Sequence, residues 1–275
     1  MSISESSGKL TSEAIASGLQ TQRFGRTAFI LDTISSTNEY ARTLDEERSI
    51  HGTLVTAEVQ TSGHGRLGRP WDSPKSKNLL FSLLLKPEQD DIHKASLIPF
   101  AAALAAAEAI EAETSLSVEC KWPNDLLIEK KKVCGMLLES SIIGTRIEKL
   151  VLGIGVNVNQ EEFPVEILPQ ATSLLIEKGA PIDRIGLLQR MLVALEKRYD
   201  QLMSGPATHV LDAWKRKTTM FGTHVTVRES HRILTGVAES LADDGSLQLR
   251  LEDGSLYTVR AGDVTLGYQQ TFLHH

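Results

Sequence analysis

Short runs of apolar and β-branched residues recur through the first half of the chain, and residues typical of turns bound each run. Runs of about four to eight such residues predict β-strands that are largely buried. The expected strands are Ala28–Ile34, Gly52–Gln60, Leu79–Lys86, Ser117–Lys121, Asp125–Glu129, Val133–Ser140 and Lys149–Asn157. So many strands in one region predict a large central sheet.

Helical spacing appears between and after these runs. Apolar residues at steps of three and four follow Pro181, and they predict an amphipathic helix that ends at Ser204-Gly205. The Ala-rich segment Lys94–Glu111 predicts a second long helix, whose small side chains allow close packing on a sheet. Shorter helices are expected at residues 11–24, Ser36–Leu44 and Ala207–Lys217.

The pattern changes after Phe221. Short alternating segments follow, separated by the turn signals Asp-Asp-Gly at 243–245 and Glu-Asp-Gly at 252–254. They predict a small antiparallel β-barrel of roughly 50 residues. We therefore expect an N-terminal extension at 1–23, a main domain at 24–218 and a small barrel domain at 219–270, which suits a chain of 275 residues.

Composition and charge narrow the class of protein. The chain is 41% hydrophobic and 23% charged, as globular proteins are, and its net charge of −6 argues against a surface built to hold nucleic acid. An anionic ligand must therefore meet local basic clusters, of which Arg66 with Arg69, Lys121, and the run Lys130–Lys132 are candidates. Taken alone, the lysine run is typical of a solvated turn.

Other classes are not expected. The longest apolar stretch, Ala95–Ile110, is interrupted by Pro99 and Glu108, so we expect no membrane span. The N-terminus lacks the basic-then-apolar order of a secretory signal, so we expect a cytoplasmic location. Two cysteines are too few for disulfides to stabilise a chain of this size, so we expect both to be buried thiols. The histidines lack the spacing of zinc ligands.

Four segments carry candidate chemistry. The loop from Gly63 to Trp71 holds three glycines and two arginines, a composition that suits close approach to an anion but also suits a plain tight turn. Lys121-Trp122-Pro123-Asn124-Asp125 presents polar residues from a stiff corner, where they could equally satisfy the turn. Lys132 precedes a strand that contains Gly135, and the segment 153–159 places two glycines and two asparagines in an apolar strand.

In this order the segments resemble the catalytic domain of the biotin protein ligases. The shared blocks are Ser36-Thr37-Asn38, a Q-x-x-G-x-G-R approach from Gln60, K-W-P-N-D from Lys121, K-x-x-G-x-L-x-E from Lys132 and G-I-G-x-N-x-N from Gly153. The resemblance runs from about residue 24 to 268. It implies an α+β fold, in which helices flank a large mixed β-sheet like that of class II synthetases and biotin/lipoate ligases, with a C-terminal SH3-like β-barrel.

The resemblance also implies the reaction. Biotin and ATP, with Mg²⁺, give biotinyl-5′-AMP, and a lysine of a biotin carboxyl carrier protein then takes the biotin. By similarity, Lys132 and Arg66 are the catalytic cations. The implied biotin-binding residues are Ser36, Thr37, Asn38, Gln60, Gly63, His64, Gly65, Arg66, Lys132 and Gly135. The implied ATP-binding residues are Arg66, Arg69, Trp71, Lys121, Asn124, Asp125, Lys132 and Asn157, with Asp125 also expected to serve the metal.

The chain departs from the family pattern in its glycine-rich loop. His64 stands where the family usually has arginine, which predicts a pH-dependent charge and a leakier adenylate. Leu67 occupies the variable position, which we interpret as neutral packing. Because residues 60–71 contain little apolar anchoring, we expect them to be mobile until ligand binds.

Alternatives remain at this stage. A lipoate or octanoate ligase shares the fold, and a non-catalytic biotin-binding protein would keep the scaffold without turnover. About 23 residues precede the first expected strand, too few for a winged helix-turn-helix domain, so we expect no nucleic-acid partner. Relatives often dimerise through an exposed sheet edge, so a homodimer is a further expectation. The acidic turn at Asp243-Asp244 is a candidate docking point for the carrier.

Overall fold

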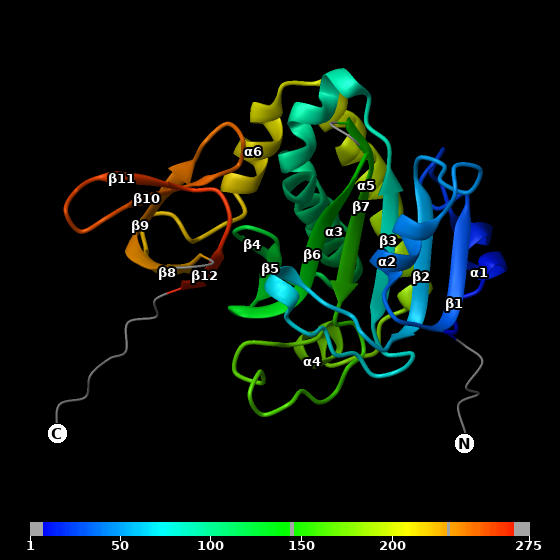
Figure 1. Cartoon of the computed structure of the whole chain (residues 1–275). Helices are drawn as coiled ribbons and strands as arrows, with labels where there is room; N and C mark the ends of the chain where they lie inside the picture. The colour runs from blue at the N-terminus through cyan, green and yellow to red at the C-terminus, as the bar shows by residue number, and fades with distance from the viewer. Residues whose placement is uncertain (1–7, 144–145, 230–231, 267–275) are drawn as a thin grey trace.

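A seven-stranded mixed sheet forms the centre of the computed structural model, which describes residues 8–143, 146–229 and 232–266. Its strands, in the spatial order β1-β2-β3-β7-β6-β5-β4, are antiparallel except for the parallel pair β1–β2 (Figure 1). Their bounds are β1 Ala28–Ile34, β2 Thr53–Gln60, β3 Leu79–Leu85, β4 Glu119–Lys121, β5 Asp125–Ile128, β6 Lys131–Ile143 and β7 Arg146–Val156.

Two strands are longer than the sequence predicts. The pairing of β6 with β7 continues from Cys134↔Val156 out to Ile143↔Arg146, past a bulge at Ser141/Ile142. At the other end of β6, the chain turns through Glu129 and Lys130, both with positive φ. The solvated-turn interpretation therefore holds for Lys130 only, because Lys131 and Lys132 belong to β6.

Helices cover the two faces of the sheet unequally. Helices α3 (Ile98–Thr114) and α5 (Arg184–Ser204) pack on one face, where Phe81 and Leu83 point into the main core (Figure 1). The short helix α2 (Thr37–Thr43) covers the other face over Leu84 and Val151. This leaves much of the α2 face free for a site. The remaining helices are α1 Ser12–Gly18, α4 Leu174–Lys178 and α6 Ala207–Lys215.

The long Ala-rich helix begins later than predicted. Residues Gln89–Leu97 form 3₁₀ turns (η2), and α3 starts at Ile98, which puts Pro99 in the first turn, where its missing N–H is not needed. Taken together, the end of η2 and α3 form a continuous helical stretch, Asp91–Thr114, which is long and apolar enough in composition to span a membrane. Of the 18-residue window that meets this criterion, 67% is buried inside the protein, as in a core helix. The first helix is shorter than expected, and α4 was not predicted.

A second, five-stranded antiparallel sheet follows α6, in the order β11-β10-β9-β8-β12. Its strands are β8 His224–Arg228, β9 Ile233–Leu241, β10 Leu247–Arg250, β11 Leu256–Val259 and β12 Asp263–Leu266. It lies beside the β4–β5 edge of the large sheet (Figure 1). The α+β prediction is confirmed; the four-residue β12 was missed because it carries no alternation long enough to recognise.

The two sheets are joined by a buried contact of the K-W-P-N-D corner. The indole N–H of Trp122 donates to the carbonyl of Gly245 at 2.9 Å, and Trp122 is buried. In the same turn, the carboxylate of Asp244 accepts the backbone N–H of Ser246 at 2.9 Å. Trp122 therefore has a structural role, and a carrier-docking role for Asp243 and Asp244 stays a prediction.

Candidate active site

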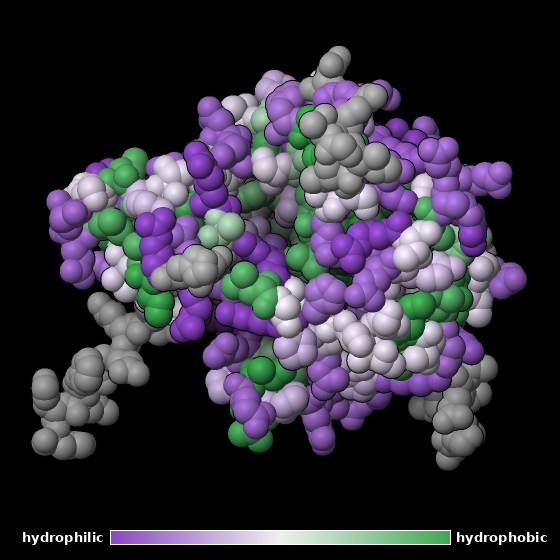
Figure 2. Space-filling model, viewed as in Figure 1, coloured by the Kyte–Doolittle hydropathy of each residue, from purple (hydrophilic) through white to green (hydrophobic). Residues whose placement is uncertain are grey.

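A cavity of about 640 Å³ opens on the α2 face of the large sheet and reaches the second sheet. A hollow is visible between the two sheets in the space-filling view (Figure 2). The structure brings nearly all of the predicted site residues to its wall. They are Ser36, Thr37, Asn38, Gln60, His64, Gly65, Arg66, Arg69, Trp71, Lys121, Asn124, Asp125, Lys132, Gly135 and Asn157.

Gly63 is the predicted residue that does not line this cavity. Its carbonyl accepts the N–H of Trp71 at 2.9 Å and closes the base of the glycine-rich loop. A Cβ at this position would lie 2.8 Å from Gln60 Nε2 and 3.0 Å from Trp71 O. A residue without a side chain is thus needed at position 63, because Gln60 and Trp71 leave no room for a Cβ behind the cavity wall.

Glycines form the floor of the cavity. In the sheet register Gly155 pairs with Gly135 on one side and with Leu80 on the other, so two neighbouring strands lack side chains at the same level. The ring of Trp71 fills this trough: a Cβ on Gly155 would lie 2.6 Å from its Cε2, and one on Gly135 would lie 2.9 Å from its Cζ3. Gly135 and Gly155, which belong to two different sequence blocks, therefore leave the space that the ring of Trp71 occupies.

The glycine-rich loop is held by its own backbone. The N–H of Gly65 donates to Arg69 O at 2.7 Å, and the N–H of Arg69 donates to Arg66 O at 3.3 Å. Leu67 adopts φ 55° and its side chain is 60% exposed, so the interpretation of Leu67 as packing is wrong. A left-handed residue at the tip turns the chain back, which lets both arginines face the cavity.

Positive and negative side chains alternate around the cavity. Lys132 Nζ lies 2.7 Å from Asp125 Oδ1, and Lys121 Nζ lies 4.0 Å from Asp125 Oδ2. The ammonium of Lys132 also lies 5.3 Å from the ring centroid of Trp71. Arg69 Nη2 pairs with Asp263 at 2.7 Å. Asp125 is therefore shared between two lysines.

Burial leaves the cations of this wall short of counter-charge. Burial lowers the pKa of Lys121, and Asp125 opposes that effect only in part. Burial likewise lowers the pKa of Arg66, against the attraction of Asp263 and Asp125. A lowered pKa means that the charged form is disfavoured in the free protein, so a bound anion would stabilise both cations. The wall is suited to an anionic ligand.

The two asparagines of the site are already engaged. The Asn124 amide donates to Met136 O, and the Asn157 amide donates to Thr172 O at 3.0 Å. Both residues therefore satisfy backbone carbonyls of other segments, and Asn124 does so on β6 and not within its own turn, so only their remaining polar atoms are free to meet a ligand.

Two groups of lining residues escaped the sequence analysis. Asp263, Thr265 and Leu266 come from β12 of the second sheet, and the segment 163–171 contributes Phe163 and its neighbours. That segment is tied to the predicted catalytic lysine, because Lys132 N–H donates to Gln170 O at 2.8 Å. The segment 163–171 could have been recognised as a candidate lining segment, because it contains apolar residues without a helix or strand pattern. No feature of the local sequence marked Asp263 as a site residue.

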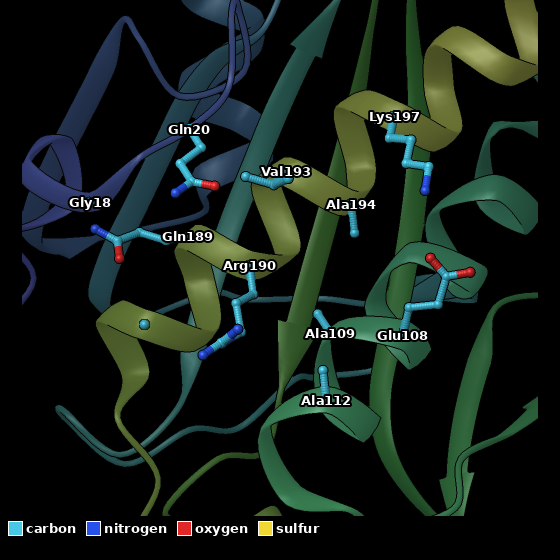
Figure 3. A pocket seen from close by; sticks show the side chains of 11 residues that line it. Gly18, Gln20, Glu108, Ala109, Ala112, Gln189, Arg190, Val193, Ala194 and Lys197 are labelled. Atoms are coloured by element: carbon cyan, nitrogen blue, oxygen red, sulfur yellow. The ribbon is translucent and has the colours of Figure 1, made fainter.

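A second cavity, of about 480 Å³, lies between α3 and α5 on the far side of the large sheet. Figure 3 shows Ala109, Ala112 and Val193 around it, with charged side chains at its rim. Two of those charges are paired, Glu108 with Arg198 and Arg190 with Glu113. This cavity contains none of the predicted site residues.

Comparison with known proteins identifies the family. The sequence model of the Biotin/lipoate A/B protein ligase family matches residues 30–157, and that of the Biotin protein ligase C terminal domain matches residues 220–267. The Bifunctional ligase/repressor BirA of Bacillus spizizenii is 36% identical over 262 residues, which are 94% of this chain and 80% of that protein.

Two further relatives agree. The Biotin--[acetyl-CoA-carboxylase] ligase of Mycobacterium tuberculosis is 33% identical over 223 residues, 78% of this chain and 79% of that protein. The structure of biotin protein ligase from Aquifex aeolicus in complex with biotin and ATP matches with a TM-score of 0.77 and 30% identity, covering 88% of this chain and 99% of that one. Together with the site geometry, these similarities show that the chain belongs to the biotin protein ligases of the biotin/lipoate A/B protein ligase family.

Proposed function

We propose that this protein is an ATP-dependent biotin protein ligase, which activates biotin as biotinyl-5′-AMP and transfers it to a lysine of a biotin carboxyl carrier protein. The observation that carries the proposal is a cavity that combines a cluster of cations with uncharged polar side chains. The cations are Lys121, Lys132 and Arg66, and burial lowers the pKa of Lys121 and of Arg66. Thr37 and Gln60 are among the uncharged polar residues. The Aquifex aeolicus relative is described as a complex with biotin and ATP.

In the first step, a carboxylate oxygen of biotin attacks the α-phosphorus of ATP, and the bond from that phosphorus to pyrophosphate breaks. Two anionic groups must approach each other, so neutralisation and alignment are the main tasks. Lys132 would serve both tasks, and its ammonium lies 5.3 Å from the ring centroid of Trp71 and 2.7 Å from Asp125 Oδ1. Arg66 and Lys121 would hold the phosphates, and Arg69 would leave Asp263 to join them.

The nucleotide and biotin would occupy opposite ends of the cavity. Ser36, Thr37 and Gln60 would meet the biotin ring, with Gly65 and His64 in the loop above it. Trp71 would pack against adenine, and Asn157 and Asn124 would support the nucleotide end.

Magnesium would be held beside Asp125. The described residues contain no group of three His, Cys, Asp or Glu side chains that could bind a metal by themselves. Asp125 is nevertheless a carboxylate in the cavity wall, with Oδ1 at 2.7 Å from the Lys132 ammonium, and Mg²⁺ often takes one or two carboxylates plus phosphate oxygens. The residues present therefore fit a Mg²⁺ ion that arrives with the triphosphate and supplies charge neutralisation.

In the second step, the ε-amine of the carrier lysine attacks the acyl carbon of the mixed anhydride. The bond from that carbon to AMP breaks, an amide forms, and the lysine loses a proton. Ile167 lines the cavity, and Val165, Ile167 and Leu168 of the same segment are exposed, so a carrier would meet these apolar side chains beside the cavity.

Mass spectrometry of the first step tests the proposal. Purified protein is incubated with Mg-ATP and, separately, biotin, lipoate or octanoate, and the acyl-adenylate is measured. We expect biotinyl-AMP alone. Lipoyl-AMP or octanoyl-AMP would assign the protein to the sister activity of the same family. Biotin binding without any adenylate would favour a binding protein.

The unusual loop residue gives a second readout in the same assay. His64 Nδ1 lies 3.3 Å from Ser62 O, so its ring is oriented by the loop itself. We expect the natural protein to release biotinyl-AMP faster than His64→Arg. Equal or slower release would contradict the leakage hypothesis. Limited proteolysis with and without biotin plus ATP tests whether residues 60–71 become ordered on binding.

We further propose that the protein forms homodimers through β1 and acts in the cytoplasm without a nucleic-acid partner. Strand β1 is one edge of the large sheet. On the other edge strand, β4, the Cys120 N–H already donates to Lys217 O at 2.7 Å. Cys120 and Cys134 are both free and buried, and burial raises the pKa of Cys120 to about 12, as expected of inert thiols. Light scattering tests the homodimer, cell fractionation tests the cytoplasmic location, and a gel-shift assay tests for binding to nucleic acid.

A further inference from the structure

A buried asparagine behind the cavity joins three segments of the chain. Asn78 stands directly before β3, is 2% exposed and does not line the cavity. Its Nδ2 donates to Ser73 Oγ at 3.0 Å and to Gln160 Oε1 at 2.6 Å. Its Oδ1 accepts the N–H of Val158 at 2.9 Å. Both N–H donors and the oxygen of this carboxamide are therefore used inside the protein.

The orientation of the Asn78 carboxamide is fixed by the backbone. The N–H of Val158 only donates, so the oxygen of the carboxamide must face it and the NH₂ group must face Ser73 and Gln160. Gln160 is oriented in turn, because its Oε1 accepts from Asn78 and its Nε2 donates to Glu162 O at 2.8 Å. A flip of either amide would set donor against donor and acceptor against acceptor. The network therefore has one arrangement of its hydrogen bonds.

The main chain of Asn78 is held by a buried ion pair. Arg184 Nη1 donates to Asn78 O at 3.0 Å and to Glu58 Oε2 at 2.7 Å. The side chains of Arg184 and Glu58 are only 4% and 2% exposed. Arg184 begins α5 and Glu58 lies in β2, so a helix and a strand together fix the position of Asn78. From this fixed point its side chain reaches two segments that have no regular structure.

The first of these segments is the end of the glycine-rich loop. Ser73 follows Trp71 by two residues and is buried, although Asp72 and Pro74 on either side of it are exposed. The hydrogen bond from Asn78 gives the buried hydroxyl of Ser73 a partner. Trp71, whose ring fills the glycine trough, is therefore attached to Asn78 through only two residues of chain.

The second segment lines the cavity before α4 and begins at Gln160. Ser173 Oγ donates to Gln160 O at 2.6 Å, so the two ends of this segment meet at Gln160. Near its far end the segment pairs with the main chain of Lys132. The Lys132 N–H donates to Gln170 O at 2.8 Å, and the Thr172 N–H donates to Lys132 O at 2.9 Å. A displacement of Gln160 would therefore be transmitted to the residue that we propose as catalytic.

We infer that Asn78 is a positioning residue for ATP, because it fixes the end of the glycine-rich loop and the start of the Gln160 segment relative to each other from behind the cavity. This inference rests on the proposed function, in which Trp71 packs against adenine. The wall proposed for biotin is held in a different way, since the Thr37 N–H donates to Gln60 Oε1 at 2.7 Å and joins α2 to β2. Loss of the two donors of Asn78 should therefore disturb ATP more than biotin.

Asn78→Asp tests the inference in the full-length protein. Aspartate keeps the shape of the side chain and an oxygen for the Val158 N–H, but its carboxylate cannot donate to Ser73 or Gln160. We expect the KM for ATP in biotinyl-AMP formation to rise roughly 5- to 30-fold, the scale of one or two hydrogen bonds, while biotin affinity measured by calorimetry without ATP stays within about twofold. Ser73→Ala removes one acceptor outside the cavity and should raise the same KM by a smaller factor.

Asn159→Asp is the matched control, because it makes the same change directly beside Gln160. Asn159 does not line the cavity, and its carboxamide donates to Ile182 O and accepts the Ile182 N–H, both at 2.9 Å. Asn159→Asp should lower the melting temperature without changing the KM for ATP. The double variant of Asn78→Asp with Ser73→Ala completes a cycle, in which the two effects on KM should fail to add because both variants break one contact.

Each outcome decides the inference. A higher KM for ATP with unchanged biotin affinity, seen in Asn78→Asp and Ser73→Ala but not in Asn159→Asp, supports it. An unchanged KM for ATP in Asn78→Asp, an equal rise in the control, or equal losses of ATP and biotin affinity that follow the melting temperature overturn it and leave the ligase proposal intact. If Asn78→Asp does not fold, the KM of Ser73→Ala decides in the same way. A wild-type protein that forms no biotinyl-AMP overturns the proposed function and this inference with it.

Discussion

Gly155→Ala is the sharpest test of how the cavity floor works. The added Cβ would lie 2.6 Å from Cε2 and 2.7 Å from Cζ2 of Trp71. Carbon atoms in contact prefer about 3.5–4.0 Å, so the ring must retreat by roughly 1 Å or the strand must bend. The ring is the softer partner, because it belongs to a loop, whereas Gly155 is paired on both sides by β3 and β6.

This geometry separates the effect on stability from the effect on activity. Overpacking that cannot relax costs about 1–3 kcal/mol, and we expect less than about 1 kcal/mol here because Trp71 moves. A displacement of about 1 Å in a positioning group can reduce turnover about 10²-fold. We therefore expect biotinyl-AMP formation to fall by up to about 10²-fold in kcat/KM for ATP, in a protein that still melts close to the wild type.

The assay pairs adenylate formation with thermal unfolding in four proteins: wild type, Gly155→Ala, Trp71→Leu and the double variant. Trp71→Leu removes the atoms that the new methyl would meet. In that background, Gly155→Ala should have little further effect on either quantity, giving a clear coupling energy. Wild-type activity and stability in the single Gly155→Ala variant would refute the proposed seating of Trp71.

Three further predictions follow from other parts of the molecule. Lys132→Ala should lower the rate of biotinyl-AMP formation by about 10²–10³-fold with little change in melting temperature, since it removes the cation at the reacting groups; a rate near the wild type in mass spectrometry would exclude Lys132 as catalytic. Trp122→Phe leaves the buried carbonyl of Gly245 without its donor and should cost about 1–3 kcal/mol in urea unfolding; an unchanged midpoint would show that this bond does not hold the two sheets together. Burial acts to raise the pKa of Glu58, but the hydrogen bond from Arg184 and its other partners outweigh burial and hold that pKa below its usual value. Its stabilising contribution is therefore present above the pKa of an unfolded glutamate and is lost as pH falls through the lowered value, so Glu58→Gln should flatten the acid side of a stability-against-pH curve.

Local sequence determined the elements and the chemical groups of the site. Strand β3 is recognisable from a run of apolar residues interrupted only by Ser82, because both faces of that strand are buried. The blocks around Lys132 and Gly153 were recognisable because a reaction at an anionic centre and a close backbone approach restrict which residue types can stand there. These features depend on neighbouring residues along the chain, so the sequence alone predicts them.

Tertiary structure alone decided which distant residues share the site. Asp263 reaches Arg69 only because the second sheet docks against the β4–β5 edge, and a single aspartate in a short strand gives no local sign of that. Ser82 looks like any small residue in an apolar strand until the register of β3 with β7 places it beneath Asn38. Register and docking are set by the sum of many weak contacts across the whole chain, and the direction of a hydrogen bond is set by its neighbours in space, so neither is written in any one segment of the sequence.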